Sequence, residues 1–205
     1  MIIKINPECP EIKLIKKAAL SLKEGNLLIF PTDTVYGLGA NVLDSGAMRK
    51  LLEIKKREMA KPFALLIGET DDVYKYCKNI PPLFFMITKR FWPGAITVVL
   101  DAQDAMPKEA MGIDSSVALR MPDSSIALSL LREAGVPIAA SSANFPGGAD
   151  PAGIDEIEKS LIDEVALVID GGMCQGVPST VVDLRGNNIK ILRQGAIAAK
   201  EINEG

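Results

Sequence analysis

Residues 30–40 read Phe30-Pro31-Thr32-Asp33-Thr34-Val35-Tyr36-Gly37-Leu38-Gly39-Ala40, and residues 55–63 read Lys55-Lys56-Arg57-Glu58-Met59-Ala60-Lys61-Pro62-Phe63. The first segment continues the apolar run 27–30, which predicts a buried strand. Its proline, threonines, aspartate and two close glycines predict a polar loop where that strand ends. A polar strand-end loop with cations following it indicates an anion-binding cleft at the end of a sheet.

Apolar periodicity predicts helices that alternate with strands along most of the chain. Residues 11–24 are amphipathic, with Ile12, Ile15, Ala19 and Leu22 on one face. Further helices are predicted to begin near 44 or 45 and at 70, 81, 124 and 154, and strands are predicted at 27–30, 63–67, 95–101, 116–121, 137–140, 166–170, 180–184 and 190–193. This alternation indicates the α/β class, and the closing strand pair makes the sheet mixed.

Composition indicates one domain spanning residues 1–205. Hydrophobic residues make up 48 % of the chain, which is ample for a core, and the net charge of −3 gives no support for strong nonspecific binding of nucleic acid. The three cysteines are far apart, which favours reduced thiols. Neither a signal pattern nor an apolar run of membrane-spanning length is present, so we expect a cytoplasmic protein without membrane contact.

The sequence contains 0 histidines. This excludes Ser-His-Asp and Cys-His nucleophile systems, HExxH metal sites and imidazole base catalysis. Any chemistry must use carboxylates, hydroxyls, amides, lysine, arginine and backbone groups. Catalysis by positioning and electrostatic stabilisation is therefore favoured over a side-chain proton shuttle.

Polar residues gather just after predicted strands, at 32–37, 120–123 and 141–148, where open α/β sheets bind their ligands. A dinucleotide fingerprint is not indicated, because Val42 occupies the place of the third glycine. A Walker A loop is excluded as well, because the sequence has no Gly-Lys pair. If the chain binds a nucleotide, it uses another arrangement.

Each candidate group has a structural interpretation beside the functional one. The cations Lys55, Arg57 and Lys61 either form a solvated helix end or bind phosphate, for which arginine offers a fork and lysine a point charge. Ser142 and Asn144 either belong to an ordinary turn or place a hydroxyl and an amide in a cleft.

Arg120, at the end of a predicted strand, pairs with either a structural carboxylate or a ligand carboxylate. Ser179 and Arg193 add further polar groups at strand ends. All of these polar groups are predicted at strand ends, where one cleft could bring them together.

Taken together, these residues resemble the YrdC-type domain of the threonylcarbamoyl-AMP synthase family. The similarity lies in short motifs that follow one another in the family's order: Pro31-Thr32-Asp33-Thr34-Val35-Tyr36-Gly37-Leu38, Lys55 and Arg57 with Lys61-Pro62, Trp92-Pro93-Gly94 before Thr97, residues 117–122 around Arg120, Ser142-Ala143-Asn144, Pro178-Ser179-Thr180-Val181-Val182-Asp183, and Leu192-Arg193 with Gly195. They cover nearly the whole chain. The resemblance implies a twisted, open mixed sheet flanked by helices, with a concave ligand cleft.

The resemblance also implies a reaction. Members of the family join L-threonine, bicarbonate and ATP into L-threonylcarbamoyladenylate and release pyrophosphate, and the product supplies the downstream machinery that makes t6A in tRNA. Magnesium is expected with the triphosphate, and no metal-binding residue of the chain is implied.

Residue by residue, the resemblance implies three groups. Lys55 and Arg57 would be catalytic. The ATP-binding residues would be Arg57, Lys61, Ser116, Ser142, Asn144 and Arg193. The threonine-binding residues would be Thr34, Arg120, Ala140 and Ser179. The chemistry agrees, because cations offset the repulsion between anionic reactants, and holding three small reactants together contributes about 7–11 kcal/mol.

The sequence departs from the family pattern at Leu66, where members that use threonine usually have a histidine. Two alternatives therefore stand beside the synthase. One is a YciO-like paralogue that binds nucleotide and uses threonine poorly. The other is a module that binds double-stranded RNA or tRNA through the cations at 49–61.

Overall fold

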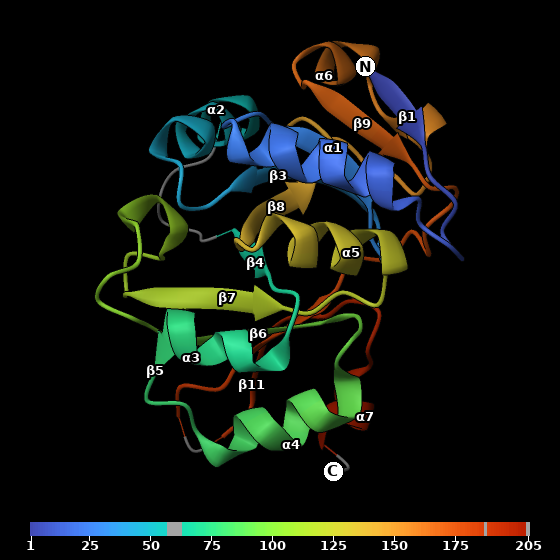
Figure 1. The fold of residues 1–205 in the computed structure, drawn as a ribbon. Coiled ribbons are helices and arrows are strands. Elements are labelled where there is room, and N and C mark those ends of the chain that lie inside the picture. Colours follow the sequence, from blue (N-terminus) through green and yellow to red (C-terminus); the bar gives the residue numbers. More distant parts are fainter. Residues whose placement is uncertain (57–62, 187, 204–205) are drawn as a thin grey trace.

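The computed structural model describes residues 1–56, 63–186 and 188–203. Within them, eleven strands form one mixed sheet in the order β1-β9-β2-β3-β8-β4-β7-β6-β10-β11, with β5 paired to β6 outside this path. Figure 1 shows helices on this sheet and the two chain ends at opposite ends of the molecule. The predicted fold class is confirmed.

The strands are β1 Ile2–Lys4, β2 Leu28–Pro31, β3 Tyr36–Asn41, β4 Ala64–Leu66, β5 Cys77–Lys78, β6 Ile96–Ala102, β7 Ser116–Arg120, β8 Ile138–Ser142, β9 Leu167–Asp170, β10 Thr180–Asp183 and β11 Lys190–Arg193. The helices are α1 Ile12–Lys23, α2 Ser45–Lys55, α3 Val73–Tyr76, α4 Pro82–Phe91, α5 Ser125–Ala134, α6 Lys159–Asp163 and α7 Ala199–Asn203. The sheet contains parallel pairs, such as β4 with β7, and antiparallel pairs, such as β3 with β8.

Helices α1 and α5 lie side by side on one face of the sheet (Figure 1). Their buried side chains, such as Leu22 and Leu130, pack with Phe30 of β2 and Ile138 of β8. The opposite face packs against a larger core, to which α2 contributes Met48. Helix α2 begins where predicted, because the Asp44 carboxylate accepts hydrogen bonds from the first amides of the helix.

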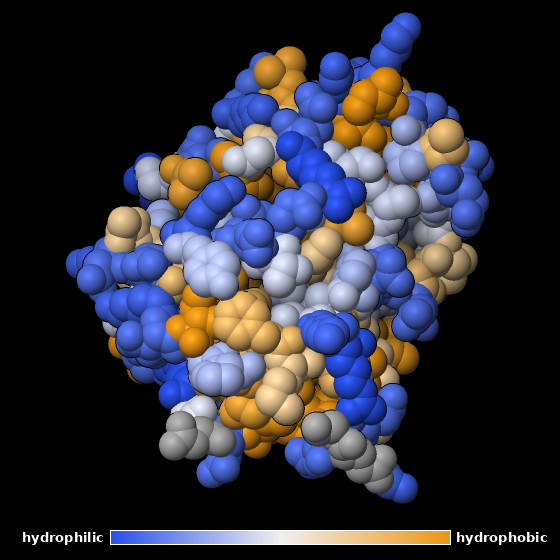
Figure 2. Space-filling view, turned by 60° about the horizontal axis from the view of Figure 1, so that its bottom comes forward, coloured by the Kyte–Doolittle hydropathy of each residue, from blue (hydrophilic) through white to orange (hydrophobic). Residues whose placement is uncertain are grey.

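Helices α4 and α7 form the end of the molecule that carries the C-terminus (Figure 1). Leu83, Met86 and Ile87 of α4 line a groove there together with Ile202 of α7. Figure 2 turns this end toward the viewer and shows hydrophobic side chains gathered beside charged ones. In the described residues, no helix combines the length and the apolar character needed to cross a membrane.

The sequence does not predict the short strands β1 and β5, and further details differ from the predictions. Part of the expected loop after β2 is the strand β3, which pairs antiparallel with β2. The acidic helix expected at 154–164 is a 3-10 turn at Ile154–Glu156 followed by the short α6. Ile12, expected on the buried face of α1, is 57 % exposed, because the buried stripe begins at Ile15.

Candidate active site

A cleft of about 290 Å³ opens on the face of the sheet that carries α1 and α5. The two helices cover this face over β2 and β8, and Leu66 and Ala140 belong both to the core beneath them and to the cleft wall. Beyond them the cleft floor consists of small or branched side chains, Ala64, Val99, Ala118 and Val181. Polar groups line one end of this apolar floor.

Arg120 is fixed at the polar end by three neighbours. Its Nη2 donates to the Asp33 carboxylate at 2.5 Å, its Nη1 to the Thr34 hydroxyl at 2.8 Å, and its Nε to the Gly94 carbonyl at 3.0 Å. Burial lowers the pKa of the guanidinium, and the Asp33 charge opposes that shift. The sequence allowed either a structural or a ligand carboxylate as the partner of Arg120. The structure shows a structural one, Asp33, and Arg120 also lines the cleft.

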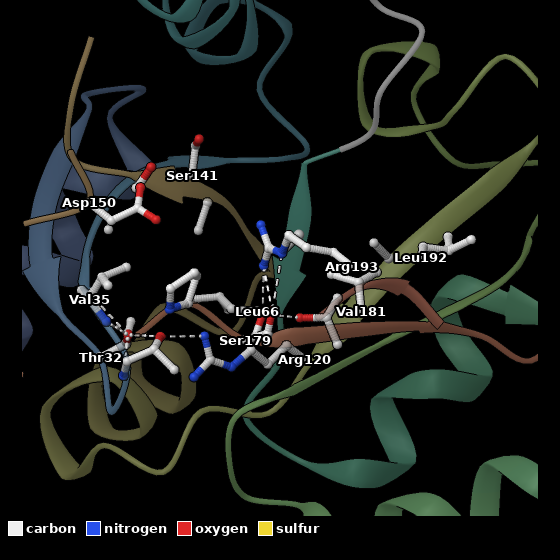
Figure 3. A pocket seen from close by; sticks show the side chains of 18 of the residues that line it. Thr32, Val35, Leu66, Arg120, Ser141, Asp150, Ser179, Val181, Leu192 and Arg193 are labelled. Carbon is white, nitrogen blue, oxygen red and sulfur yellow. Dashed lines mark hydrogen bonds between the residues drawn. The ribbon is translucent and has the colours of Figure 1, made fainter. Parts of the chain in front are cut away.

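The Thr34 hydroxyl is held between two groups. It accepts from Arg120 and lies 3.0 Å from the Thr32 hydroxyl, which itself donates to the Val35 carbonyl at 2.7 Å. Since a hydroxyl has only one hydrogen to donate, Thr34 must donate to Thr32. The turn that follows β2 therefore orients this hydroxyl rigidly, and Figure 3 shows Arg120 directed toward the turn at Thr32.

Arg193 of β11 also lines the cleft, and Ser179 lies between it and Arg120 (Figure 3). Its Nη2 and Nε donate to the Ser179 carbonyl at 2.7 and 3.2 Å, and Nη2 also lies 3.1 Å from the Ser179 hydroxyl. That hydroxyl forms a buried hydrogen bond of 2.8 Å with Thr97 of β6. Ser179 therefore links two strands and one arginine at a single point of the cleft.

Gly195 explains the glycine of the Leu192-Arg193-x-Gly195 motif. A Cβ at this position would lie 2.3 Å from the Pro178 carbonyl oxygen and 2.5 Å from the Ser179 backbone. The Gly195 amide donates to the Thr180 hydroxyl at 2.9 Å. Only a residue without a side chain lets the segment after β11 pass this close to Ser179.

Lys55, Ser142 and Asn144 form a second group. The Lys55 ammonium, at the end of α2, donates to the backbone carbonyls of Ser142 and Asn144 at 3.1 and 2.7 Å and to the Asn144 Oδ1 at 2.7 Å. The Ser142 hydroxyl donates to the same Oδ1 at 2.9 Å. Asn144 and Lys55 thus hold the loop after β8 in place, and Ser142 alone of the three lines the cleft.

The structure brings six predicted residues together in the cleft wall: Thr34, Arg120, Ala140, Ser142, Ser179 and Arg193. Ser116 lies at the opposite end of β7 from Arg120, outside this wall, and its hydroxyl donates to Asp114 at 2.6 Å. Arg57 and Lys61 lie outside the described residues.

Sequence reasoning missed two acidic groups. Asp33 is the buried partner of Arg120, and Asp150 lines the cleft, where it accepts from the Asn144 amide at 3.2 Å. Asp33 belongs to the opening segment, but no sequence signal pairs it with an arginine 87 positions away. Leu66, in the histidine's place, is buried in the cleft wall.

Comparisons with known proteins identify a family and solved structures that resemble this chain. The Sua5/YciO/YrdC family model, whose description reads "Telomere recombination", matches residues 21–195. A Pyrococcus abyssi protein named threonylcarbamoyl-AMP synthase is 38 % identical over 205 residues, which are 100 % of this chain and 60 % of that protein. The chain thus spans less than two thirds of that relative.

Two solved structures resemble the fold. Sua5 of P. abyssi complexed with L-threonine matches with a TM-score of 0.95 at 38 % identity, over 100 % of this chain and 60 % of that one. YciO of E. coli matches with a TM-score of 0.91 at 26 % identity, over 98 % of both chains. The family model, the shared fold and the ordered motifs around the cleft place the chain in the Sua5/YciO/YrdC family.

Proposed function

We propose that the chain is an L-threonylcarbamoyladenylate synthase, acting as one domain over residues 1–205 and supplying the t6A modification of tRNA. The observation that carries the proposal is the cleft, in which an arginine held by Asp33 and Thr34 stands beside a serine held by a second arginine. The likeness to a Sua5 complexed with L-threonine supports the same conclusion.

The reaction begins with carbamate formation from the threonine amine and bicarbonate, with loss of water. A carbamate oxygen then attacks the α-phosphorus of ATP, a P–O bond forms, and the bond to the leaving pyrophosphate breaks. The reactants are anions that repel one another. Fixed cations offset that repulsion without reorganising during the reaction.

The cleft residues divide this work. Arg120 and Ser179 bind the threonine carboxylate, with Thr34 and Ala140 beside it. Arg193 and Ser142 contact the nucleotide, as do Arg57 and Lys61, and the apolar floor at Ala64 and Ala118 accommodates an uncharged part of the ligand. Lys55 and Asn144 act by holding the Ser142 loop.

Magnesium enters as the counter-ion of the triphosphate. Among the described residues, no group of three or more aspartate, glutamate, cysteine or histidine side chains lies close enough together to hold a metal ion. No step of the proposed reaction is therefore assigned to a metal held by those residues.

Leu66 favours a second candidate, a YciO-like protein that binds nucleotide and uses threonine poorly. Its aliphatic side chain lies in the cleft wall beside Arg120, its register partner on β7, and offers no hydrogen bond to an amino acid. The match to YciO over nearly the whole of both chains supports this candidate too.

One assay separates the two candidates. The protein is incubated with ATP, bicarbonate and threonine, and pyrophosphate is measured. The synthase releases pyrophosphate only when both threonine and bicarbonate are present. Binding of ATP without threonine-dependent release would contradict the synthase and favour the YciO-like protein. Arg120→Lys serves as the negative control for threonine-dependent release, because lysine keeps the positive charge but lacks the planar guanidinium that binds a carboxylate with two hydrogen bonds.

A further inference from the structure

The Arg120–Asp33 pair is buried on both sides. The two side chains are 7 % and 8 % exposed, and Nη2 and Oδ1 lie 2.5 Å apart. Asp33 is the second residue after β2, whereas Arg120 ends β7, so the pair joins two separate parts of the sheet. A buried guanidinium without a counter-ion would be strongly destabilising, and Asp33 supplies that counter-ion.

Asp33 lies behind Arg120 as seen from the cleft. The cleft wall includes Thr32, Thr34 and Arg120, but Asp33 lines a different cavity of about 530 Å³, together with Glu8, Asp123 and Cys174. A ligand in the cleft therefore meets Arg120 and not Asp33. Asp33 therefore acts on that ligand through Arg120, whose charge and orientation it sets.

The three partners of Arg120 use three of its five N–H groups. The other two, one on Nη1 and one on Nη2, have no partner among the described residues. Arg193, by contrast, is held by oxygens of Ser179 and forms no ion pair within the described part of the chain. The two arginines of the cleft thus differ in how firmly they are oriented.

We propose that Asp33 is a positioning residue for the amino acid, and this inference rests on the proposed function. Asp33 neutralises the Arg120 charge and fixes the guanidinium plane, so that its two remaining N–H groups face the threonine carboxylate. Because the pair has no net charge, Arg120 recognises the carboxylate by direction more than by long-range attraction. The nucleotide, held by Arg193 and Ser142, does not depend on Asp33.

The test compares threonine binding with ATP binding, each measured by isothermal titration calorimetry. Asp33→Asn keeps the shape but replaces the charge-assisted hydrogen bond from Arg120 Nη2 by a weaker one to a neutral amide oxygen, so the guanidinium is held less firmly. We expect threonine affinity to fall roughly 10- to 100-fold, the factor for one hydrogen bond to a charged group. ATP affinity should stay unchanged. The matched control Asp183→Asn removes a carboxylate from Arg185 outside the cleft and should change neither affinity.

Thermal unfolding reports whether each variant folds. If Asp33→Asn does not fold, Asp33→Glu replaces it, since it keeps the charge but displaces the carboxylate by one methylene. The same selective loss of threonine affinity is expected. A parallel loss of threonine and ATP affinity, or unchanged threonine affinity, would overturn the positioning role. Absence of threonine binding by the unaltered protein would instead contradict the proposed function.

Discussion

Arg193 shows how much one residue type matters in the cleft. Its guanidinium donates twice to the Ser179 carbonyl, a geometry that needs a planar fork. Lysine offers only a point charge at the end of a flexible stem, so it would keep the cation but lose its direction.

We predict that Arg193→Lys lowers ATP affinity roughly 10-fold, because one charge-assisted hydrogen bond loses its alignment. The melting temperature should change little, because Arg193 is exposed. Calorimetric titration with ATP measures the effect, and Arg132→Lys, at an exposed ion pair with Glu69, serves as the control. Equal effects of the two substitutions would argue against a role of Arg193 at the nucleotide.

Tyr36 carries a prediction about pH. Its hydroxyl donates to the Gly172 carbonyl at 2.8 Å and accepts from the Gly171 amide at 3.2 Å, and burial raises its pKa from 10.0 to about 12. A raised pKa means that the folded state holds the proton more tightly than the unfolded state. The resulting stabilisation is complete below pH 10 and is lost as the pH rises toward 12.

We therefore expect the unaltered protein to lose more stability than Tyr36→Phe between pH 10 and 12. Urea unfolding at several pH values measures the difference. Burial also raises the pKa of Tyr76, so the tyrosine absorbance of the two proteins is compared, and a late-titrating group should be missing in Tyr36→Phe. If the free energies of unfolding of the two proteins depend on pH in the same way, Tyr36 has the same pKa in the folded and the unfolded state, which would contradict the prediction.

At the scale of the element, β3 depends on one of its glycines, Gly39. A Cβ on Gly39 would lie 2.6 Å from Cε1 of Phe30 and 2.7 Å from Cγ2 of Ile138, both in the core beneath α1 and α5. A Cβ on Gly37, two positions earlier on the same strand, would make only ordinary contacts of 3.7 Å or more.

Gly39→Ala should therefore destabilise the fold by about 1–3 kcal/mol, the usual cost of overpacking a core. Gly37→Ala is the matched control and should unfold close to the unaltered protein. Chemical denaturation followed by circular dichroism gives both free energies of unfolding. Similar values for the two variants would show that the core absorbs the added methyl at Gly39.

The segment after β11 also contains a glycine, Gly195, that has no room for a side chain. Gly195→Ala would push this segment away from the Ser179 backbone and displace Arg193 with it. We expect both ATP affinity and turnover to fall. Gly186→Ala, where a Cβ would meet nothing within 4 Å, should leave both unchanged. Unaltered ATP binding by Gly195→Ala would show that the contact at Ser179 does not fix Arg193.

Elements with a strong periodic signal could be predicted, and those set by distant packing could not. Helix α5 was evident from its apolar stripe and from Gly135, which ends it with a φ of 64°. Strand β3 was not, because its glycines favour a loop locally and become suitable for a strand only when Phe30 and Ile138 close over them.

At the scale of the whole molecule, the site could be predicted only where a motif marks the residue. The motifs identified Thr34, Arg120, Ser179 and Arg193, which the structure brings together in one cleft. The partnership with Asp33 could not be predicted, because the sheet order that makes β2 and β7 meet at the cleft is a property of the complete fold.

The last two strands carry a prediction at this scale. Strand β10 pairs in parallel with β6 and contributes Val181 to the cleft, and β11 covers β10. A chain ending at residue 177 should expose the backbone of β6 as an open sheet edge and aggregate. Size-exclusion chromatography measures this outcome, and a monomeric, cooperatively folded product would contradict it.

The residues that form the cleft emerge from the ribosome at different times. The cleft walls join Thr34 to Arg120, 86 positions apart, and Thr97 to Ser179, 82 positions apart. During synthesis on the ribosome, the N-terminal part of the chain emerges and begins to fold first. Arg193 emerges after the segments that carry Thr34, Arg120 and Ser179, and until then Ser179 lacks its arginine. A nascent chain can therefore build most of its core before the cleft is complete, so a ligand of the complete cleft cannot guide the early steps of folding.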